Sequence, residues 1–257
     1  MKSSWQKRCV GIIVGCLILV SGVQGQMAIG VKGGVLVGKP GYSRAYRSIY
    51  LEEYNVGFAP GMTIGAVADI KVGSKFSLQN EINYSLKGVK ISKEGSDYVT
   101  NTMMMHYIDY PILLKTRLNK GRQKYYITFG PTISYWLGGN MNISANELDE
   151  WNLERVKLGF TFNPENSLDG SKIYIPDANR FQFGLSIGGG FENELHNGQR
   201  FIVDFRYDIG HTFLSKEREV NTDLVTYQAN METNNQVFAV SVIFVYDLNT
   251  LRRNLAK

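Results

Sequence analysis

The chain has 257 residues, a formal net charge of +5, and 44% hydrophobic residues. Its length is enough for one large domain or two small ones. Lys2, Lys7 and Arg8 lie at the extreme N-terminus, so the rest of the chain is nearly neutral and its charge gives no reason to expect a nucleic acid partner. Glycine, tyrosine and phenylalanine are abundant (27, 15 and 13 residues), which favours β-structure with tight interiors and turns.

Residues 1–25 have the layout of a secretory signal peptide. The basic start is followed by an apolar run over 10–20, which is too short for a membrane-spanning helix of about 20 residues, and small residues precede Gln26. A loose lipoprotein cleavage box ends at Cys16, but apolar residues follow it, whereas a lipidated cysteine should open a polar segment. We favour the cleaved signal, which would remove Cys9 and Cys16 and leave a mature chain without disulfides.

Eight later segments alternate between apolar and polar side chains, which is the pattern of strands with two different faces. Ordinary strands have about 5–6 residues, whereas tilted membrane-spanning strands need about 9–11, and most of these segments reach the greater length. The segments cover residues 28–37, 58–70, 76–87, 105–118, 124–137, 181–193, 200–211 and 236–247.

Side-chain size indicates which face of these segments points inward. In 200–211, Phe201, Val203 and Phe205 alternate with Asp204 and Arg206. A soluble lipocalin-type barrel would also alternate, with its polar face in water. However, the narrow interior of an eight-stranded barrel needs small residues, and a wet surface does not. Glycines recur on the polar face, at Gly30, Gly34, Gly61, Gly65, Gly130, Gly184, Gly188, Gly190 and Gly210. We therefore expect the apolar face to meet lipid.

Short and long connections alternate strictly along the chain. The short ones lie at 71–75, at 119–123 and around Gly198, which follows Asn197. The long ones cover 38–57, 88–104, 138–180 and 212–235. Outer-membrane barrels have short periplasmic turns and long extracellular loops, which would place both termini in the periplasm.

The sequence thus predicts an all-β fold: an eight-stranded antiparallel up-and-down transmembrane β-barrel over 26–248, preceded by a cleaved signal peptide. We expect it in a bacterial outer membrane, in contact with outer-membrane lipid, with a periplasmic tail at 249–257.

Aromatic residues gather near both ends of the predicted strands, as two interfacial girdles require. Those expected at the turn end are Phe76, Tyr125, Phe201 and Tyr246. Those expected at the loop end are Phe58, Tyr84, Tyr110, Tyr135 and Phe181, together with Tyr107 and Trp136.

Several short motifs carry a family resemblance. They are IGVKGG at 29–34, AVADI at 66–70, KFSLQ at 75–79, DYPILLK at 109–115, FGPT at 129–132 and FRYDIG at 205–210. In this order they resemble the outer-membrane β-barrel family of Bacteroidota called PorT-like or "porin family" proteins. The resemblance covers nearly the whole mature chain and implies a fold and a location, while some members belong to protein-secretion or gliding apparatus. One departure is that barrels of this class commonly end on an aromatic residue, whereas here Asp247, Leu248 and a basic tail follow Tyr246.

Charged residues share the inward face of the predicted strands. They are Lys32, Asp69, Glu81, Lys115, Arg117, Asp204, Arg206 and Asp208. Because unpaired charges in a narrow lumen are costly, we expect these residues to pair with one another and to plug the barrel. The alternative is a narrow, gated conduction or proton path.

Histidine and aspartate occur together near the loop end, where a histidine could act as a general base. His106 and Asp109 begin one predicted strand, and Asp208 and His211 end another. His211 falls on the lipid-side parity and the two strands are far apart, so we expect no catalytic residue and no enzyme. His196 is the third histidine, and with no paired spacing and no mature cysteine we expect neither a metal site nor a cofactor.

The connection 138–180 is longer than most loops, and such loops are usually functional or disordered. Its acidic residues are Glu147, Asp149, Glu150 and Glu154, and its apolar anchors are Trp151, Phe160 and Phe162. We expect a short helix near 145–156 and a hairpin near 156–176. The segment is either a solvated loop or the surface for a protein partner. The leading hypothesis is a structural or interaction role, ahead of a part in a secretion apparatus.

Overall fold

The computed structural model describes residues 26–42, 55–93, 99–119, 121–145, 153–161, 168–169, 172–176, 178–195, 198–215, 219–221, 228–230 and 233–250. The predicted signal peptide, with both cysteines, lies outside these residues, as do His196 and most of the predicted tail. None of the helices in these ranges is long and apolar enough to cross a membrane.

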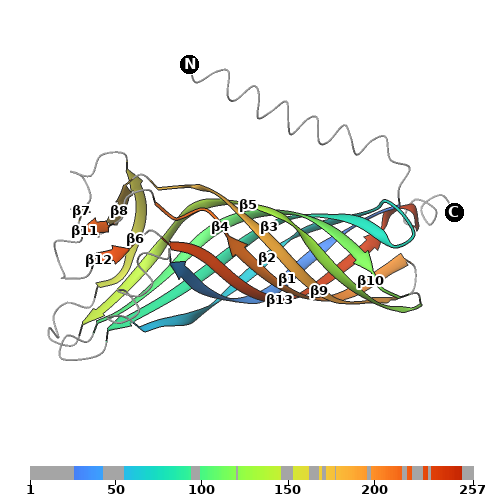
Figure 1. The fold of residues 1–257 in the computed structure, drawn as a ribbon, viewed down its shortest axis with the longest axis horizontal. Coiled ribbons are helices and arrows are strands. Elements are labelled where there is room, and N and C mark those ends of the chain that lie inside the picture. Colours follow the sequence, from blue (N-terminus) through green and yellow to red (C-terminus); the bar gives the residue numbers. More distant parts are fainter. Residues whose placement is uncertain are drawn as a thin grey trace, which may run out of the picture.

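Eight long strands form a closed antiparallel ring (Figure 1). They are β1 (Met27–Tyr42), β2 (Asn55–Lys71), β3 (Phe76–Lys93), β4 (Val99–Arg117), β5 (Gln123–Ala145), β9 (Phe181–Glu194), β10 (Gln199–Gly210) and β13 (Thr233–Asp247). Chain neighbours pair with each other, β5 pairs with β9, β10 pairs with β13, and β13 returns to β1. The predicted eight-stranded up-and-down barrel is confirmed.

Most of the strands continue further toward the long connections than the sequence predicts. β1 ends at Tyr42 instead of residue 37, β4 begins at Val99 instead of 105, and β5 ends at Ala145 instead of 137. Ladder pairing continues there, from Met105↔Gly139 to Val99↔Ala145. These stretches were predicted as loops because their glycine and asparagine, and the loss of apolar alternation, resemble loop composition.

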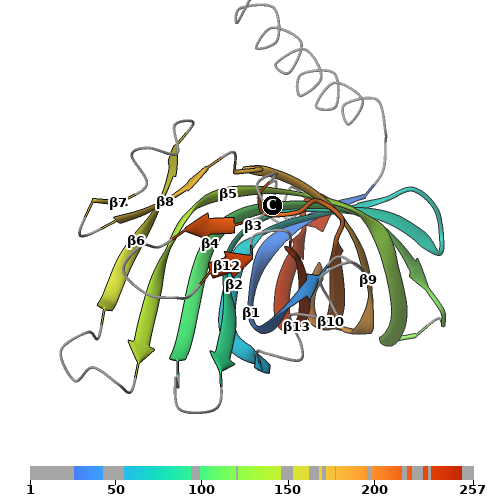
Figure 2. The same ribbon diagram turned by 60° about the vertical axis from the view of Figure 1, so that its left-hand side comes forward.

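Three further strands continue the barrel sheet beyond β5 at the loop end, which is the end that carries the long connections (Figure 2). It contains β6 (Leu153–Thr161), β7 (Leu168–Asp169) and β8 (Lys172–Pro176), which we call the extension. A separate two-stranded ladder joins β11 (Glu219–Asn221) and β12 (Gln228–Asn230). β5 pairs with β9 as far as Tyr135↔Phe181 and then with β6.

The predicted helix near 145–156 is wrong at its described ends, because Ala145 and residues 153–156 are in strands. The predicted hairpin near 156–176 is confirmed only for its second part, where β7 and β8 form a short antiparallel pair, whereas β6 pairs with β8 in parallel. The inward side chains of Val156 and Leu158 have the period of a strand, and they cover an apolar cluster described below. Burial of this face decided the local structure.

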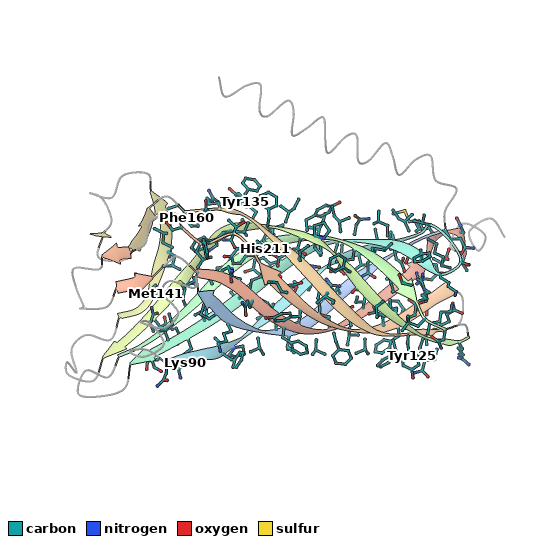
Figure 3. The ribbon with its side chains drawn as sticks, viewed as in Figure 1. Lys90, Tyr125, Tyr135, Met141, Phe160 and His211 are labelled. Carbon is teal, nitrogen blue, oxygen red and sulfur yellow. The ribbon has the colours of Figure 1, made fainter. Side chains whose placement is uncertain are left out.

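The outer surface of the barrel is apolar (Figure 3), and its interior holds most of the buried polar and charged side chains together with separate apolar clusters. Exposed apolar side chains cover most strands, for example Val31, Ile64, Ile82, Phe129, Ile187 and Val242. Inward glycines allow the strands to coil tightly: a Cβ on Gly30 would overlap the carbonyl oxygen of Phe244, and one on Gly190 that of Val203. This arrangement has the polarity that a lipid-embedded barrel requires.

Of the predicted girdle residues, Phe58, Phe76, Tyr84, Tyr110, Tyr125 and Phe181 are exposed, while Tyr135, Phe201 and Tyr246 are half-buried. Tyr107 and Trp136 are not girdle residues, because both are fully buried and stack with ring centroids 6.1 Å apart. Both residues have the inward parity of their strands. The girdle prediction considered only how near they lie to the strand ends, and it was therefore wrong for these two residues.

Candidate functional site: the lumen and its cover

Glu81 is the centre of an ion cluster in the middle of the lumen. Its carboxylate accepts two hydrogen bonds from Arg206, at 2.8 and 2.9 Å, and one from Lys32 Nζ at 3.0 Å. The amides of Gln79 and Asn83 donate to the same carboxylate at 2.6 and 2.8 Å. Asp204 forms ion pairs with the same two cations, because its Oδ2 lies 2.9 Å from Arg206 Nη2 and 3.6 Å from Lys32 Nζ.

All four charged groups of this central cluster are buried. Such a buried carboxylate is tolerated because cations and amides satisfy its lone pairs. Tyr126 adds a further donor, with its hydroxyl 2.8 Å from Asp204 Oδ1. The cluster joins β1, β3, β5 and β10, so it spans the lumen from wall to wall.

A second ion cluster fills the lumen toward the short turns, which we call the turn end. Arg117 donates to Glu192 at 2.7 Å and to Asp69 at 3.0 Å. Arg200 lies 2.9 Å from Asp69 and 3.3 Å from Glu192. Lys115 Nζ lies 2.9 Å from Glu192 and 4.1 Å from the ring centre of Tyr126. Three cations therefore surround two carboxylates, and all five side chains are buried.

The structure brings seven of the eight predicted lumenal charges into these two clusters. Lys32, Glu81, Asp204 and Arg206 form the central one, and Asp69, Lys115 and Arg117 belong to the turn-end one. Asp208 stays apart: among the described residues it has no cation within 4.0 Å, and its carboxylate accepts a hydrogen bond from Ser186 Oγ at 2.5 Å.

Sequence reasoning missed Glu192 and Arg200, which the turn-end cluster needs. Both have the inward parity of their strands, the same signal that identified Asp204. Both residues lie next to a predicted hairpin. Charged residues are common in hairpin turns, so these two were assigned to the turn and not to the lumen.

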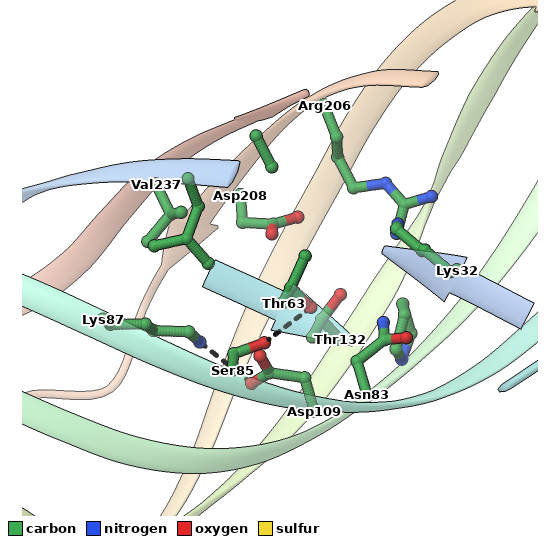
Figure 4. Close-up of a pocket in the computed structure, with 13 residues that line it drawn as sticks. Lys32, Thr63, Asn83, Ser85, Lys87, Asp109, Thr132, Arg206, Asp208 and Val237 are labelled. Atoms are coloured by element: carbon green, nitrogen blue, oxygen red, sulfur yellow. Dashed lines mark hydrogen bonds and ion pairs between the residues drawn. The ribbon is translucent and has the colours of Figure 1, made fainter. Parts of the chain in front are cut away.

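A small polar cavity lies on the loop-end side of the central cluster (Figure 4). Its volume is about 20 Å³, on a scale where one water molecule needs about 10–15 Å³. Lys87 Nζ and Ser134 Oγ both contact Asp109 Oδ1, at 2.9 and 2.5 Å. Asn83 also lines the cavity, and its amide nitrogen donates to Glu81 of the central cluster.

Apolar side chains cover this cavity at the loop end. We call them the loop-end cluster: Val89, Ile91, Met103, Met105, Tyr107, Trp136, Met141, Val156, Leu158, Ile175 and Leu214. Tyr107 forms the boundary, because its ring lies 4.5 Å from Lys87 Nζ while its hydroxyl accepts hydrogen bonds from Gln182 and Asn235 at 3.2 and 3.0 Å. Polar lumen and apolar cover therefore meet at this residue.

Arg180 attaches the extension to the barrel where β5 changes partners. Its Nε donates to the carbonyl oxygen of Trp136 at 3.1 Å, and the Trp136 amide donates to the Arg180 carbonyl at 2.8 Å. The guanidinium lies 4.6 Å from the ring centre of Tyr135, on the barrel, and 4.7 Å from that of Phe160, on β6. The side chain thus lies between two aromatic rings, one on the barrel strand β5 and one on the extension strand β6.

The predicted histidine–aspartate pairs are separated in the structure. His106 faces outward with its Nδ1 2.5 Å from the Tyr84 hydroxyl, whereas Asp109 faces the cavity and pairs with Lys87. His211 is exposed, while Asp208 lines the cavity. Throughout the described ranges, no group of three or more His, Cys, Asp or Glu residues is arranged to hold a metal ion.

Comparison with known proteins identifies a family for residues 23–216, which match the profile described as "Outer membrane protein beta-barrel domain". No curated protein matches the chain. Among solved structures, OprG from Pseudomonas aeruginosa is 12% identical, with 86% of this chain and 95% of that chain covered and a TM-score of 0.46. Neisserial surface protein A is 12% identical (86% and 98% covered, TM-score 0.35), and Ail of Yersinia pestis is 10% identical (86% and 98% covered, TM-score 0.33).

Proposed function

We propose a closed barrel with an interaction role for this chain, which belongs to the outer membrane protein β-barrel domain family. It is therefore a β-barrel of the bacterial outer membrane, and its apolar face lies in lipid. The proposal has two parts. The lumen does not conduct ions, and the extension presents a surface to a protein partner outside the cell.

The two ion clusters carry the first part. An ion entering the lumen would have to separate Glu81 from Arg206, or the turn-end carboxylates from Arg117. Removing one partner from a buried pair costs about 3–5 kcal/mol, and an eight-stranded barrel has no spare interior width. The apolar layer of Tyr107 and Trp136 adds a second barrier on the loop-end side.

The folded extension supports the second part. A connection that only joined two strands could be as short as Val72–Lys75, between β2 and β3. The β5–β9 connection instead builds strands of its own and buries Val156, Leu158 and Ile175. Rigid elements that project from a barrel hold a binding surface in place better than solvated loops do.

We place the extension outside the cell and both termini in the periplasm. The proposal follows from the short connections, since outer-membrane barrels keep these on the periplasmic side. The first described residue, Gln26, lies at this end, where its carbonyl oxygen accepts a hydrogen bond from Lys71 N. Cysteine substitutions can test the orientation because the predicted mature chain has no cysteine of its own.

On intact cells, a membrane-impermeant maleimide should label Lys157→Cys on the extension and should label Lys75→Cys at the turn end only after lysis. The reverse result would overturn the orientation. A conductance measurement tests closure: the purified protein in a planar bilayer should show no nanosiemens openings, and stable openings of that size would refute it.

The protein is, on this proposal, not an enzyme. A general base needs a partner within hydrogen-bond reach, and here His106 faces outward while Asp109 faces the lumen. A part in a protein-secretion or gliding apparatus is a narrower version of the interaction role. Crosslinking from position 157 in native membranes would identify such a partner, with position 75 as the matched control.

A further inference from the structure

Basic residues are concentrated at the turn end of the barrel. The short turns, the strand ends beside them and the residues that follow β13 contain eight basic and two acidic residues. The stretches 38–57, 88–104, 138–180 and 212–235, toward the loop end, contain eleven basic and fifteen acidic residues. The two ends of the barrel therefore differ in charge, and the excess of positive charge lies beside the short turns.

Four described residues carry this excess, and we call them the basic rim: Lys71, Lys75, Arg122 and Lys124. Lys71 ends β2 and Lys75 directly precedes β3, so both belong to one turn. Arg122 directly precedes β5, and its Nε donates to the carbonyl oxygen of Glu194, at the end of β9, at 3.1 Å. The Lys71 ammonium group interacts electrostatically with Lys124, although β3 and β4 separate their strands. The basic rim thus follows the wall of the barrel from one turn to the next.

Few carboxylates are available to neutralise the basic rim. Lys75 and Arg122 are exposed, and in the described part of the chain neither has a carboxylate within 4.0 Å. Glu194 pairs with Lys124, which leaves Asp247 as the other acidic residue of the turn end. The residues outside the described ranges that adjoin these turns, β1 and β13 are 1–25, 120, 196–197 and 251–257. They contain no aspartate or glutamate, so the sequence offers no further anion there.

Exposed apolar and aromatic side chains lie beside the basic rim. Val72 and Phe76, on the turn of Lys75, are 67% and 49% exposed. Tyr125, which follows Lys124, is 52% exposed. Short turns keep their charges near the level where the lipid chains end, so these cations lie among headgroups while the aromatic rings lie at the interface. An occupant that matches this face surrounds the barrel and carries negative charge.

We propose that the basic rim binds the phosphate groups of anionic phospholipids in the leaflet around the turn end. Membrane electrostatics act over a Debye length of about 8 Å at physiological salt, so the four cations need not converge on one phosphate. A lipid fits better than an acidic protein, because the charges lie on separate turns beside girdle residues, where lipid is already in contact. The proposal that this is the inner leaflet rests on the orientation proposed above, whereas the binding itself does not.

Native mass spectrometry of the mature chain with graded amounts of dioleoyl phosphatidylglycerol tests the proposal. The Lys75→Gln/Arg122→Gln variant should bind this lipid at least about fivefold more weakly, since one basic residue near an anionic membrane surface contributes about fivefold in affinity. The Lys90→Gln/Lys157→Gln variant removes two exposed lysines toward the loop end instead and should bind like the wild type. No loss in the first variant, or equal losses in both, would overturn the proposal.

Two further arms identify what the basic rim recognises. Dioleoyl phosphatidylcholine has the same chains but no net charge, and it should bind the wild type as weakly as phosphatidylglycerol binds the first variant. Equal binding of the two lipids by the wild type would refute a role for the anionic headgroup. Ammonium phosphate should displace phosphatidylglycerol no more than ammonium acetate of equal ionic strength does, and stronger displacement would make this a free-anion site instead.

Heat-modifiable gel mobility should show that both variants are folded, because the four substituted side chains are exposed. Where the first variant misfolds, Lys75→Arg/Arg122→Lys provides the test: it exchanges the two cations and should keep binding, and its loss of binding would contradict a role for charge. Failure of the lipid proposal would leave the closed barrel untouched, since that proposal depends on the lumen and on conductance. A reversed orientation would change the leaflet and not the binding.

Discussion

The inward face of β4 changes along the strand, from charged side chains toward the turn end to apolar ones toward the loop end. Toward the turn end its inward residues are Lys115 and Arg117 and its outward residue Leu114 is exposed to lipid. Toward the loop end the same inward parity carries Met105 and Met103, both buried in an apolar cluster. Within lipid the outside must be apolar and the inside holds the polar groups. Beyond it, the strand packs like one in a soluble protein.

This reversal explains both the closed lumen and the folded extension. Ion pairs can fill a lumen whose outer wall is in lipid, because tight coiling brings charges from several strands into contact. At the loop end the strands continue and bury apolar side chains instead, among them Val156 of β6 and Ile175 of β8. Asp109 and Tyr107 mark the change, two residues apart on one strand.

The largest effect should come from breaking the central cluster. Glu81→Ala leaves Lys32 and Arg206 buried beside an empty site and should reduce the free energy of unfolding by about 4 kcal/mol. Urea unfolding in lipid vesicles, followed by gel mobility, measures it. Glu194→Ala, a half-buried carboxylate at the turn end, is the control and should cost at most about 1 kcal/mol. Equal losses would contradict the special role of the lumen.

Truncation within the loop-end cluster should be nearly as costly but confined to that half. Met105 is fully buried, so Met105→Ala should cost about 3 kcal/mol through a cavity. Hydrogen exchange should rise in β6 and β8 and stay low around Glu81. If exchange rises throughout the barrel instead, the two halves are a single cooperative unit.

The outer face should show the same boundary. Ile64 is exposed in the middle of β2, and Ile64→Lys should cost about 2–3 kcal/mol in vesicles, because a charge would face lipid. Thr102→Lys, toward the loop end of β4 between β3 and β5, should change the free energy of unfolding by less than about 0.5 kcal/mol. A large penalty at Thr102 would place the membrane boundary higher than Tyr107.

The smallest effect should follow from loosening the junction at Arg180. Arg180→Ala removes one hydrogen bond and two cation–π contacts, which together contribute about 1 kcal/mol at a half-buried position. Limited proteolysis should then cut near β6 sooner while the gel mobility of the barrel is unchanged. An Arg180→Lys variant should restore only part of the protection, because lysine lacks the planar group.

Alternating polarity was enough to predict the eight strands, because a strand between lipid and a narrow lumen must change environment at every residue. The same parity identified seven lumenal charges that the structure pairs, and it could have found Glu192 and Arg200. The alternation failed to predict the loop-end parts of β4 and β5. These parts have no regular apolar outward face, so their sequence resembles a loop although they are paired in the structure.

Only the tertiary structure decided which distant groups meet. Chain position separates Glu81 from Arg206 and Asp69 from Arg200, and the ring brings each pair within 2.9 Å. It also separated His106 from Asp109, three residues apart in sequence but on opposite sides of the wall. The physical reason is that the alternation along a strand reflects which face of the wall each side chain occupies. Which distant side chains touch depends instead on the curvature and coil of the closed sheet. The barrel and most of its lumenal charges were therefore readable from the sequence, and the partners that each charge meets in the two ion clusters were not.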